Sequence, residues 1–306
     1  MLIANPIYDV VFKRMLENER VARFFIGTLL NETITAVEVR PQEFTTIGAK
    51  EVLTVFRLDF IATVLTASGE AKKVLIEIQK AQHQIDIMRF RNYLGEQYRK
   101  REVINGHATP LPITTIYILG TNLPGIETPC LKVERGYRDM ISQQPITAKS
   151  DFIEQLTHDS YVVQVERVTG RFQTRLEKLL SVFEQTNFID DLKTVKEFLH
   201  EPDTEELRLI TDILHHSGTN PAERKQIEIE QEAWRTFNAQ IAEEKRSFEE
   251  KERAYNKAMA EMGEALNEKD QALSERDQAL SEKDQALSEK DRYIQELLRK
   301  LKEKEE

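Results

Sequence analysis

Hydrophobic side chains recur with a helical period near the amino terminus, in residues 6–30, "PIYDVVFKRMLENERVARFFIGTLL". Polar residues separate the apolar positions in the spacing of an amphipathic helix. Pro6 suits the first turn, where a missing N–H costs little. The pattern predicts a helix over this stretch, with these apolar positions: Val10, Val11, Met15, Phe24 and Phe25.

From residue 34 to residue 118 the pattern becomes that of β-strands. Runs of β-branched and aliphatic residues occur in "ITAVEV", "VFRLDFIATVL", "KKVLIEIQ" and "PITTIYIL". The polar interval 82–104 has a helical pattern instead, and it ends before "NGHATP", where Asn, Gly and Pro predict a stop and a loop. The segments "CLKVERGYRDM" and "SYVVQVERV" predict further short strands.

Strand signals fade after Gly170, and the remaining chain has a helical pattern. Helices are predicted in "RFQTRLEKLLSVFEQ", "LKTVKEFLHE" and "DTEELRLITDILHH". From Pro221 onward there is no further proline, and the length of the Glu/Lys/Ala-rich run predicts an extended helix or a coiled coil. We therefore expect an α/β domain in residues 1–170, a helical region in 171–220 and a long helix or coiled coil in 221–306.

The last segment contains a heptad repeat, "EKDQALS", "ERDQALS", "EKDQALS" and "EKDRYIQ". A coiled coil needs two apolar layers in each heptad, but an Asp stands four residues after each of the first four leucines. Two interpretations follow: a solvated helix with charge pairs four residues apart, or a homo-oligomerisation element. The residues that recur every seven positions are Leu266, Leu273, Leu280, Leu287, Ile294 and Leu301.

Composition and charge restrict the classes of function. The formal net charge is −10, but residues 1–170 carry 20 basic and 20 acidic side chains, so the acidity belongs to the second half. A neutral amino-terminal half can still present a basic face to phosphate. The single cysteine, Cys130, excludes an intramolecular disulfide, and no apolar stretch is long enough to cross a bilayer. We expect a soluble, cytoplasmic protein without a signal peptide.

The segment "VFRLDFIATVLTASGEAKKVLIEIQKAQ" predicts a β-hairpin, because two strand-like runs flank a turn at Ser68-Gly69. If residues 67–69 form a three-residue loop, Thr66 faces Glu70, and Asp59 lies directly opposite Glu77. A two-residue loop would instead place a carboxylate on each face of the hairpin. Only the three-residue loop gathers the polar groups on one face.

In that register Asp59 and Glu77 are cross-strand neighbours, and Gln79 lies on the same face opposite Arg57. Two carboxylates this close repel unless they share a proton or a cation. Mg²⁺ or Mn²⁺ accepts such oxygen ligands, with the backbone carbonyl of Ile78 as a further ligand. Gln79 would orient a metal-bound water. The alternative is an exposed sheet face on which Asp59, Glu77 and Gln79 meet solvent.

The predicted helix 82–104 combines basic and aromatic side chains, which suits contact with a nucleic-acid backbone and base stacking. Helical spacing places Arg89 beside Tyr93 and Arg91 near Tyr98. The alternative is an ordinary amphipathic helix with packed tyrosines and solvated arginines. Its other basic residues are Arg99, Lys100 and Arg101.

The order of "YDVVFKRML", "RLDF", "IEIQK" and "MRFRNYLGEQY" resembles the PD-(D/E)XK nuclease superfamily, and more narrowly the bacterial recombination-promoting nuclease and putative transposase group. The likeness covers roughly residues 5–170. It implies a restriction-endonuclease-like mixed central sheet flanked by helices. It also implies a metal-dependent DNA endonuclease linked to recombination or transposition.

By position, Asp59 matches the metal-binding Asp of the motif and Glu77 its second acid. The sequence departs from the motif at Gln79, where the superfamily usually has a lysine that helps to place the attacking water. Glutamine is nonetheless common in the narrower group. An alternative function is a catalytically decayed nuclease fold that binds DNA or protein and oligomerises through its helical tail. Further residues match the group's helix motifs: Asp9, Phe12, Lys13, Arg89, Tyr93 and Tyr98.

Overall fold

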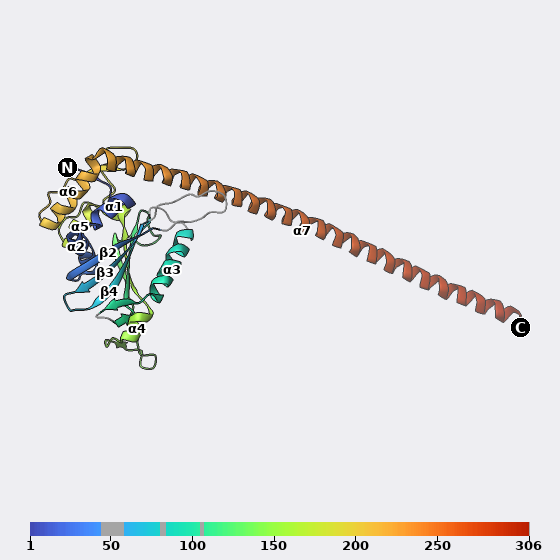
Figure 1. Cartoon of the computed structure of the whole chain (residues 1–306). Helices are drawn as coiled ribbons and strands as arrows, with labels where there is room; N and C mark the ends of the chain where they lie inside the picture. The colour runs from blue at the N-terminus through green and yellow to red at the C-terminus, as the bar shows by residue number, and fades with distance from the viewer. Residues whose placement is uncertain (44–57, 80–83, 105–106, 306) are drawn as a thin grey trace. The chain divides into compact units, whose positions relative to one another are not determined.

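A computed structural model describes residues 1–43, 58–79, 84–104 and 107–305. Its helices and strands alternate over the first two thirds of the chain (Figure 1). The elements are β1 (Leu2–Ala4), α1 (Asp9–Leu16), α2 (Glu19–Leu30), β2 (Ile34–Glu43), β3 (Leu58–Thr66), β4 (Ala71–Gln79), α3 (Gln84–Arg99), β5 (Glu102–Ile104), β6 (His107–Thr109), β7 (Ile113–Leu119), β8 (Cys130–Val133), β9 (Tyr137–Arg138), β10 (Pro145–Ile146), α4 (Asp151–Leu156), β11 (Asp159–Gln164), the 3₁₀ helix η1 (Val165–Arg167), α5 (Arg175–Ser181), β12 (Val195–Glu197), α6 (Glu205–Thr219) and α7 (Pro221–Glu305).

The chain divides into two compact units, Met1–Arg235 and Thr236–Glu306. The first unit contains the central sheet, the helices that cover it, and the first turns of α7. Residues 171–235 thus fold together with the α/β domain predicted for residues 1–170. The second unit is the remainder of α7, so the prediction of a long helix after Pro221 is confirmed.

The central sheet is mixed, with six strands in the order β2-β3-β4-β7-β11-β8. The strands β2, β3 and β4 run antiparallel, β4, β7 and β11 run parallel, and β8 is antiparallel to β11 at the edge. Parallel neighbours need a crossover connection. Helix α3 lies in the connection from β4 to β7, so it is positioned to cover one face of the sheet (Figure 1).

The hairpin register predicted for β3 and β4 is confirmed over the paired residues. Phe60 pairs with Ile76 and Leu65 with Ala71, as a three-residue loop requires. The Thr66 amide donates to the Glu70 carbonyl oxygen at 2.9 Å. Gly69 closes the loop with a φ of 83°, a left-handed conformation that glycine adopts without strain.

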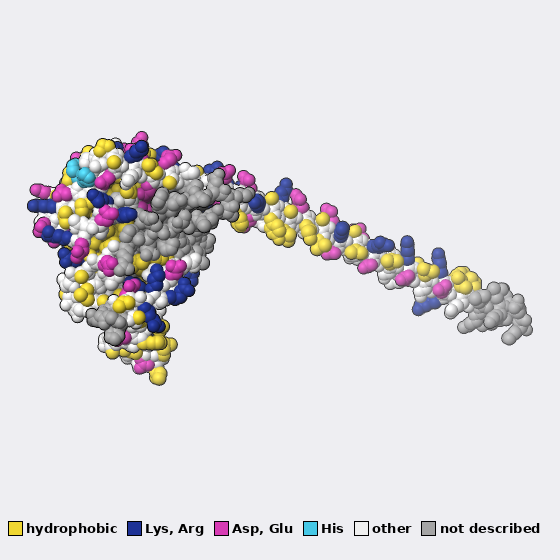
Figure 2. Space-filling view, in the orientation of Figure 1, with side chains coloured by type: hydrophobic (Ala, Val, Ile, Leu, Met, Phe, Trp, Pro, Cys, Tyr) yellow, Lys and Arg dark blue, Asp and Glu magenta, His cyan; other side chains and the backbone are white. Residues whose placement is uncertain are grey.

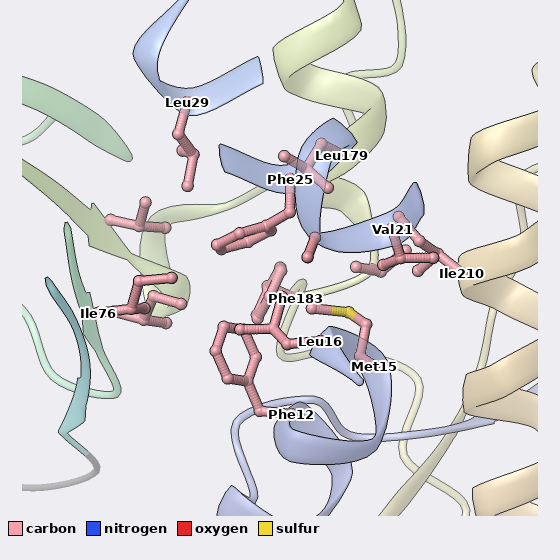
Figure 3. Close-up of a cluster of buried hydrophobic side chains, with 14 of the residues drawn as sticks. Phe12, Met15, Leu16, Val21, Phe25, Leu29, Ile76, Leu179, Phe183 and Ile210 are labelled. Atoms are coloured by element: carbon pink, nitrogen blue, oxygen red, sulfur yellow. The ribbon is translucent and has the colours of Figure 1, made fainter. Parts of the chain in front are cut away.

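The main core lies between one face of this sheet and the helices α1, α2, α5 and α6 (Figure 3). Strands contribute alternate residues, such as Phe60 and Ile76, because side chains on a strand point to the two faces in turn. Phe12 of α1 is completely buried, and its ring packs edge-on against Phe25 at 5.4 Å and Phe60 at 5.3 Å between centroids. Such contacts fix α1 and α2 against β3.

A second, smaller core lies on the opposite face, beneath α3. Ile61, Leu75 and Ile113 of the sheet pack there against Phe90 and Tyr93 of the helix. Both faces of the central strands are therefore covered. Any polar residue on the α3 face of β4 must lie in a largely buried environment.

The continuous helix predicted over residues 6–30 is wrong. The chain forms β1, then α1 from Asp9, and a separate helix α2 from Glu19. Asn18 causes the break, since its side-chain oxygen accepts from the backbone amides of Arg20 and Val21 and so caps α2. Two short helices can both pack against the sheet, whereas one straight helix of this length would extend beyond it.

The helix predicted at "LKTVKEFLHE" is also wrong, because residues 195–197 form strand β12. This strand pairs antiparallel with β1, with Ala4 opposite Val195. The prediction that the carboxyl half is entirely helical is therefore wrong, because this half contains a strand. Tertiary pairing with β1 overrides a local pattern that is compatible with a helix.

Pairing of β12 buries the side chain of Lys196, which is 2% exposed. Its ammonium donates to the Glu184 carbonyl oxygen. Burial lowers the pKa of Lys196 to about 7, although the charge of Glu184 acts in the opposite direction. The folded protein therefore releases a proton at a pH where the unfolded chain still holds it.

Lys196→Met should consequently change the pH dependence of stability. In the wild type, the free energy of unfolding should rise from about pH 7 to about pH 10, because the unfolded state binds more protons there. The variant should lack the part of this increase in unfolding free energy that Lys196 contributes. Urea unfolding at several pH values measures the difference. Exposed Lys149→Met is the matched control and should follow the wild type. Equal pH profiles for wild type and Lys196→Met would contradict the assignment.

The helix predicted over residues 82–104 is confirmed for its central part, Gln84–Arg99. Its carboxyl end is corrected, since Glu102–Ile104 forms β5 and pairs with β6, with Ile104 opposite His107. The loop predicted at "NGHATP" thus contains a short strand. The predicted strands at 34–39, 72–79 and 112–119 are confirmed, as are short strands in "CLKVERGYRDM" and "SYVVQVERV".

Candidate functional site

The candidate site centres on Glu77, near the carboxyl end of β4. Alternation along the strand places Glu77 on the same face as Leu75, beneath α3. The side chain is only 2% exposed. The alternative in which Glu77 lies on a solvated sheet face is therefore wrong.

Asp59 is the second residue of β3, and its backbone pairs with Gln42 of β2. The β3–β4 pairing runs from Leu65, opposite Ala71, to Phe60, opposite Ile76. The pairing of Asp59 with Glu77, one further step along both strands, stays a prediction. The side chain of Asp59 lies outside the described part of the chain, as do Arg57 and Lys80.

Gln79 and Ile78 end the same strand. Gln79 is half-buried, shares the face of Glu77, and its carbonyl oxygen accepts from the Gly120 amide at 2.7 Å. Ile78 points its side chain into the main core on the opposite face. Strand β4 thus carries an acid, a core residue and an amide in succession, and it is held between β3 and β7.

Tyr117 is a neighbour of Glu77 that the sequence pattern did not identify. It lies on β7, and parallel pairing sets it beside Glu77. Burial raises the pKa of the Tyr117 hydroxyl, and the negative charge of Glu77 raises it further. Tyr117 therefore stays protonated and neutral, and it lines the α3 face next to the acid. No local signal marked it, because its position depends on the register between two distant strands.

The residues predicted from the opening helix motif lie elsewhere. Asp9 is 4% exposed and is the first residue of α1. Its backbone amide donates to a carboxylate oxygen of Glu230 at 3.0 Å, and that of Val10 donates to the other oxygen at 3.2 Å. Glu230, in the first turns of α7, thus caps α1 with a charge that suits a helix amino terminus.

Lys13 is half-buried and lines a surface cavity of about 330 Å³ together with Glu38 of β2 and Phe60 of β3. Helix α1 covers the sheet face opposite to α3. The structure therefore does not place Asp9 and Lys13 on the face that carries Glu77.

Helix α3 divides the predicted DNA-facing residues. Arg91, Arg99 and Lys100 are exposed, whereas Tyr93 is 3% exposed and packs against the sheet. Tyr98 is half-buried, and its hydroxyl lies 2.8 Å from Nδ1 of His158. Burial removes Tyr93 from any base-stacking surface and makes it a packing residue. The side chain of Arg89 lies outside the described residues.

The donor types at this site fit a hard divalent cation. Mg²⁺ and Mn²⁺ bind carboxylate and carbonyl oxygens, which Glu77, Asp59 and the Ile78 carbonyl supply. Burial costs the Glu77 carboxylate part of its solvation, and a cation would offset that cost. Within the described ranges no three His, Cys, Asp or Glu side chains cluster as metal ligands.

None of the helices in the described part of the chain is both long and apolar enough to cross a membrane. Comparison with known protein families, curated proteins and solved structures finds no significant match.

Proposed function

We propose that this chain is a Mg²⁺- or Mn²⁺-dependent DNA endonuclease that acts in recombination or transposition, with a restriction-endonuclease-like fold. One observation supports the proposal: the paired register ends at Phe60 opposite Ile76, one residue before Asp59 and the buried Glu77, and Gln79 shares the face of Glu77. The exposed basic residues of α3 support a DNA substrate, since the helix covers that same face.

In the proposed reaction, each residue of the site has a separate role. Asp59, Glu77 and the Ile78 carbonyl would hold the cation. When bound, the cation would lower the pKa of a water molecule and stabilise charge on a phosphate oxygen. The Gln79 amide would orient that water by a hydrogen bond, but it cannot take the proton or supply positive charge.

Cleavage of supercoiled plasmid by the full chain tests the activity. With Mg²⁺ or Mn²⁺ we expect nicked circles and then linear DNA, and with EDTA we expect neither. Cleavage that persists in EDTA would contradict a metal-dependent mechanism. Absence of cleavage under every condition would favour the alternative below.

DNA binding should depend on Arg91. If its guanidinium contacts a phosphate, Arg91→Gln should reduce the slope of log K against log salt by about 0.9, because one fewer counterion is released. Arg23→Gln is the control, since Arg23 lies on α2, on the opposite side of the sheet, and contacts the Thr35 carbonyl oxygen. Fluorescence anisotropy across salt concentrations measures both slopes. Equal slopes for Arg91→Gln and the wild type would exclude this contact.

A second candidate function is a binding scaffold built on a decayed nuclease fold. Gln79, in place of a charged lysine, and the long exposed helix α7 favour this alternative. It predicts DNA or protein binding without metal affinity at Glu77. Metal binding and DNA binding therefore distinguish the two functions.

A further inference from the structure

Helix α7 exposes a continuous apolar stripe in the unit Thr236–Glu306 (Figure 2). Apolar side chains from Phe248 to Leu287 are between 52% and 69% exposed. A soluble chain rarely leaves so long a row of large apolar side chains in water without a partner. The stripe consists of Phe248, Tyr255, Met259, Met262, Leu266, Leu273, Leu280 and Leu287.

One heptad frame describes the whole stripe, but the heptad position that carries most of the apolar residues differs between its upstream and downstream parts. If the leucines at 266, 273, 280 and 287 occupy position a, then position d of the same frame holds Phe248, Tyr255 and Met262 upstream. Among the leucines, from residue 269 to residue 290, position d is occupied by basic side chains instead. The basic d residues are Lys269, Arg276, Lys283 and Lys290.

This change of position decides between the two orientations of a paired helix. In a parallel pair, each residue faces its own copy, so Lys269, Arg276 and Lys283 would each meet a like charge in the core. In an antiparallel pair, position a of one helix faces position d of the other. Phe248, Tyr255 and Met262 of one copy then meet downstream leucines of the other.

We propose that α7 forms an antiparallel coiled coil with a second copy of this chain. In the central register, Phe248 faces Leu280 of the second copy, Tyr255 faces Leu273, and Met262 faces Leu266. Glu252 then faces Arg276, an opposite charge where a parallel pair would set Glu252 against itself. Two pairs in this register are less favourable, since Lys245 faces Lys283 and Met259 faces Lys269. Registers one heptad to either side also set Phe248, Tyr255 and Met262 opposite apolar residues.

The flanking positions agree with this orientation. Position g, beside each core leucine, is alanine at residues 265, 272, 279 and 286. In the antiparallel pair, g residues face g residues, and in the central register Ala265 meets its own copy at the two-fold axis. Small side chains there let the two helices approach closely and bury the leucines.

The arrangement has a consequence for the amino-terminal units. With the axis near residue 264, the two copies of residue 236 lie about 80 Å apart, at 1.5 Å per helical residue. A parallel pair would hold them side by side, about 10 Å apart. The two amino-terminal units would thus attach at opposite ends of the coiled coil. The dimer does not depend on the carboxylate pair, so its failure and that of the endonuclease are distinguishable.

Disulfide trapping in a Cys130→Ser background tests the orientation in the full chain. Phe248→Cys chains are mixed with Leu273→Cys, Leu280→Cys or Leu287→Cys chains and oxidised. We expect a covalent dimer of roughly twice 35.6 kDa in at least one mixture, about tenfold more abundant than in any variant alone. The partner that traps best identifies the register.

Two trapping results would contradict the antiparallel coiled coil. Efficient trapping of Leu280→Cys with itself would show a parallel pair, and absence of trapping in every mixture would exclude the seam. Sedimentation equilibrium provides a second measurement, in which Leu273→Asp should abolish the dimer. Ser274→Asp, an exposed neighbour outside the seam, should leave it intact. A monomeric wild type would overturn the proposal.

Discussion

Glu77→Gln is expected to lower the rate of Mg²⁺-dependent plasmid nicking about a thousand-fold, since a metal supplies several kcal/mol of charge stabilisation and 1.36 kcal/mol corresponds to tenfold. The substitution keeps the size of the side chain but replaces one accepting carboxylate oxygen with a donating amide nitrogen. It also removes the negative charge that would hold the cation. Because Glu77 is buried, a neutral amide should also spare the fold the cost of a buried charge.

The control for this experiment is Glu70→Gln, the same chemical change at an exposed position in the hairpin loop. It should nick at the wild-type rate. Asp59→Asn should behave like Glu77→Gln if the register continues one step beyond the pair Phe60 and Ile76 and so sets the two acids opposite each other. If Glu77→Gln cleaves as fast as Glu70→Gln, this hairpin does not contain the active site.

Phe12→Ala is expected to destabilise the amino-terminal unit by about 3–5 kcal/mol, the usual cost of a phenylalanine cavity in a core. Phe12 is completely buried and links α1 to Phe25 of α2, Phe60 of β3 and Phe183. Its loss would free α1 from the strand that carries Asp59. Urea unfolding followed by circular dichroism measures the change.

Phe152→Ala makes the same substitution at a side chain that is 72% exposed on α4. Its effect should stay within about 0.5 kcal/mol, as for other surface changes. A Phe12→Ala effect as small as that of Phe152→Ala would contradict the packing of α1 against β3. A large loss of nicking in Phe12→Ala at low temperature, with the fold intact, would indicate that α1 positions the site.

The features that were predictable from the sequence depend on neighbouring residues. The hairpin register followed from Ser68-Gly69 and the alternation of the two strands, and it is confirmed from Leu65 opposite Ala71 to Phe60 opposite Ile76. The long helix after Pro221 followed from its composition.

The features that escaped prediction depend on long-range pairing. Tyr117 lies beside Glu77 only because β4 and β7 pair in one parallel register. Lys196 is buried only because β12 pairs with β1 across most of the unit. Glu230 caps α1 from a position more than two hundred residues away. Local periodicity carries no information about such partners, and it predicted a helix where β12 forms.

The central claim is that Glu77, with Asp59, binds a divalent cation, and Mn²⁺ titration calorimetry tests it most directly. The wild type and Glu70→Gln should bind Mn²⁺, whereas Glu77→Gln and Asp59→Asn should each show no measurable heat of binding. Circular dichroism of each variant would verify that the fold is retained. Equal Mn²⁺ affinity in Glu77→Gln and the wild type would contradict the claim.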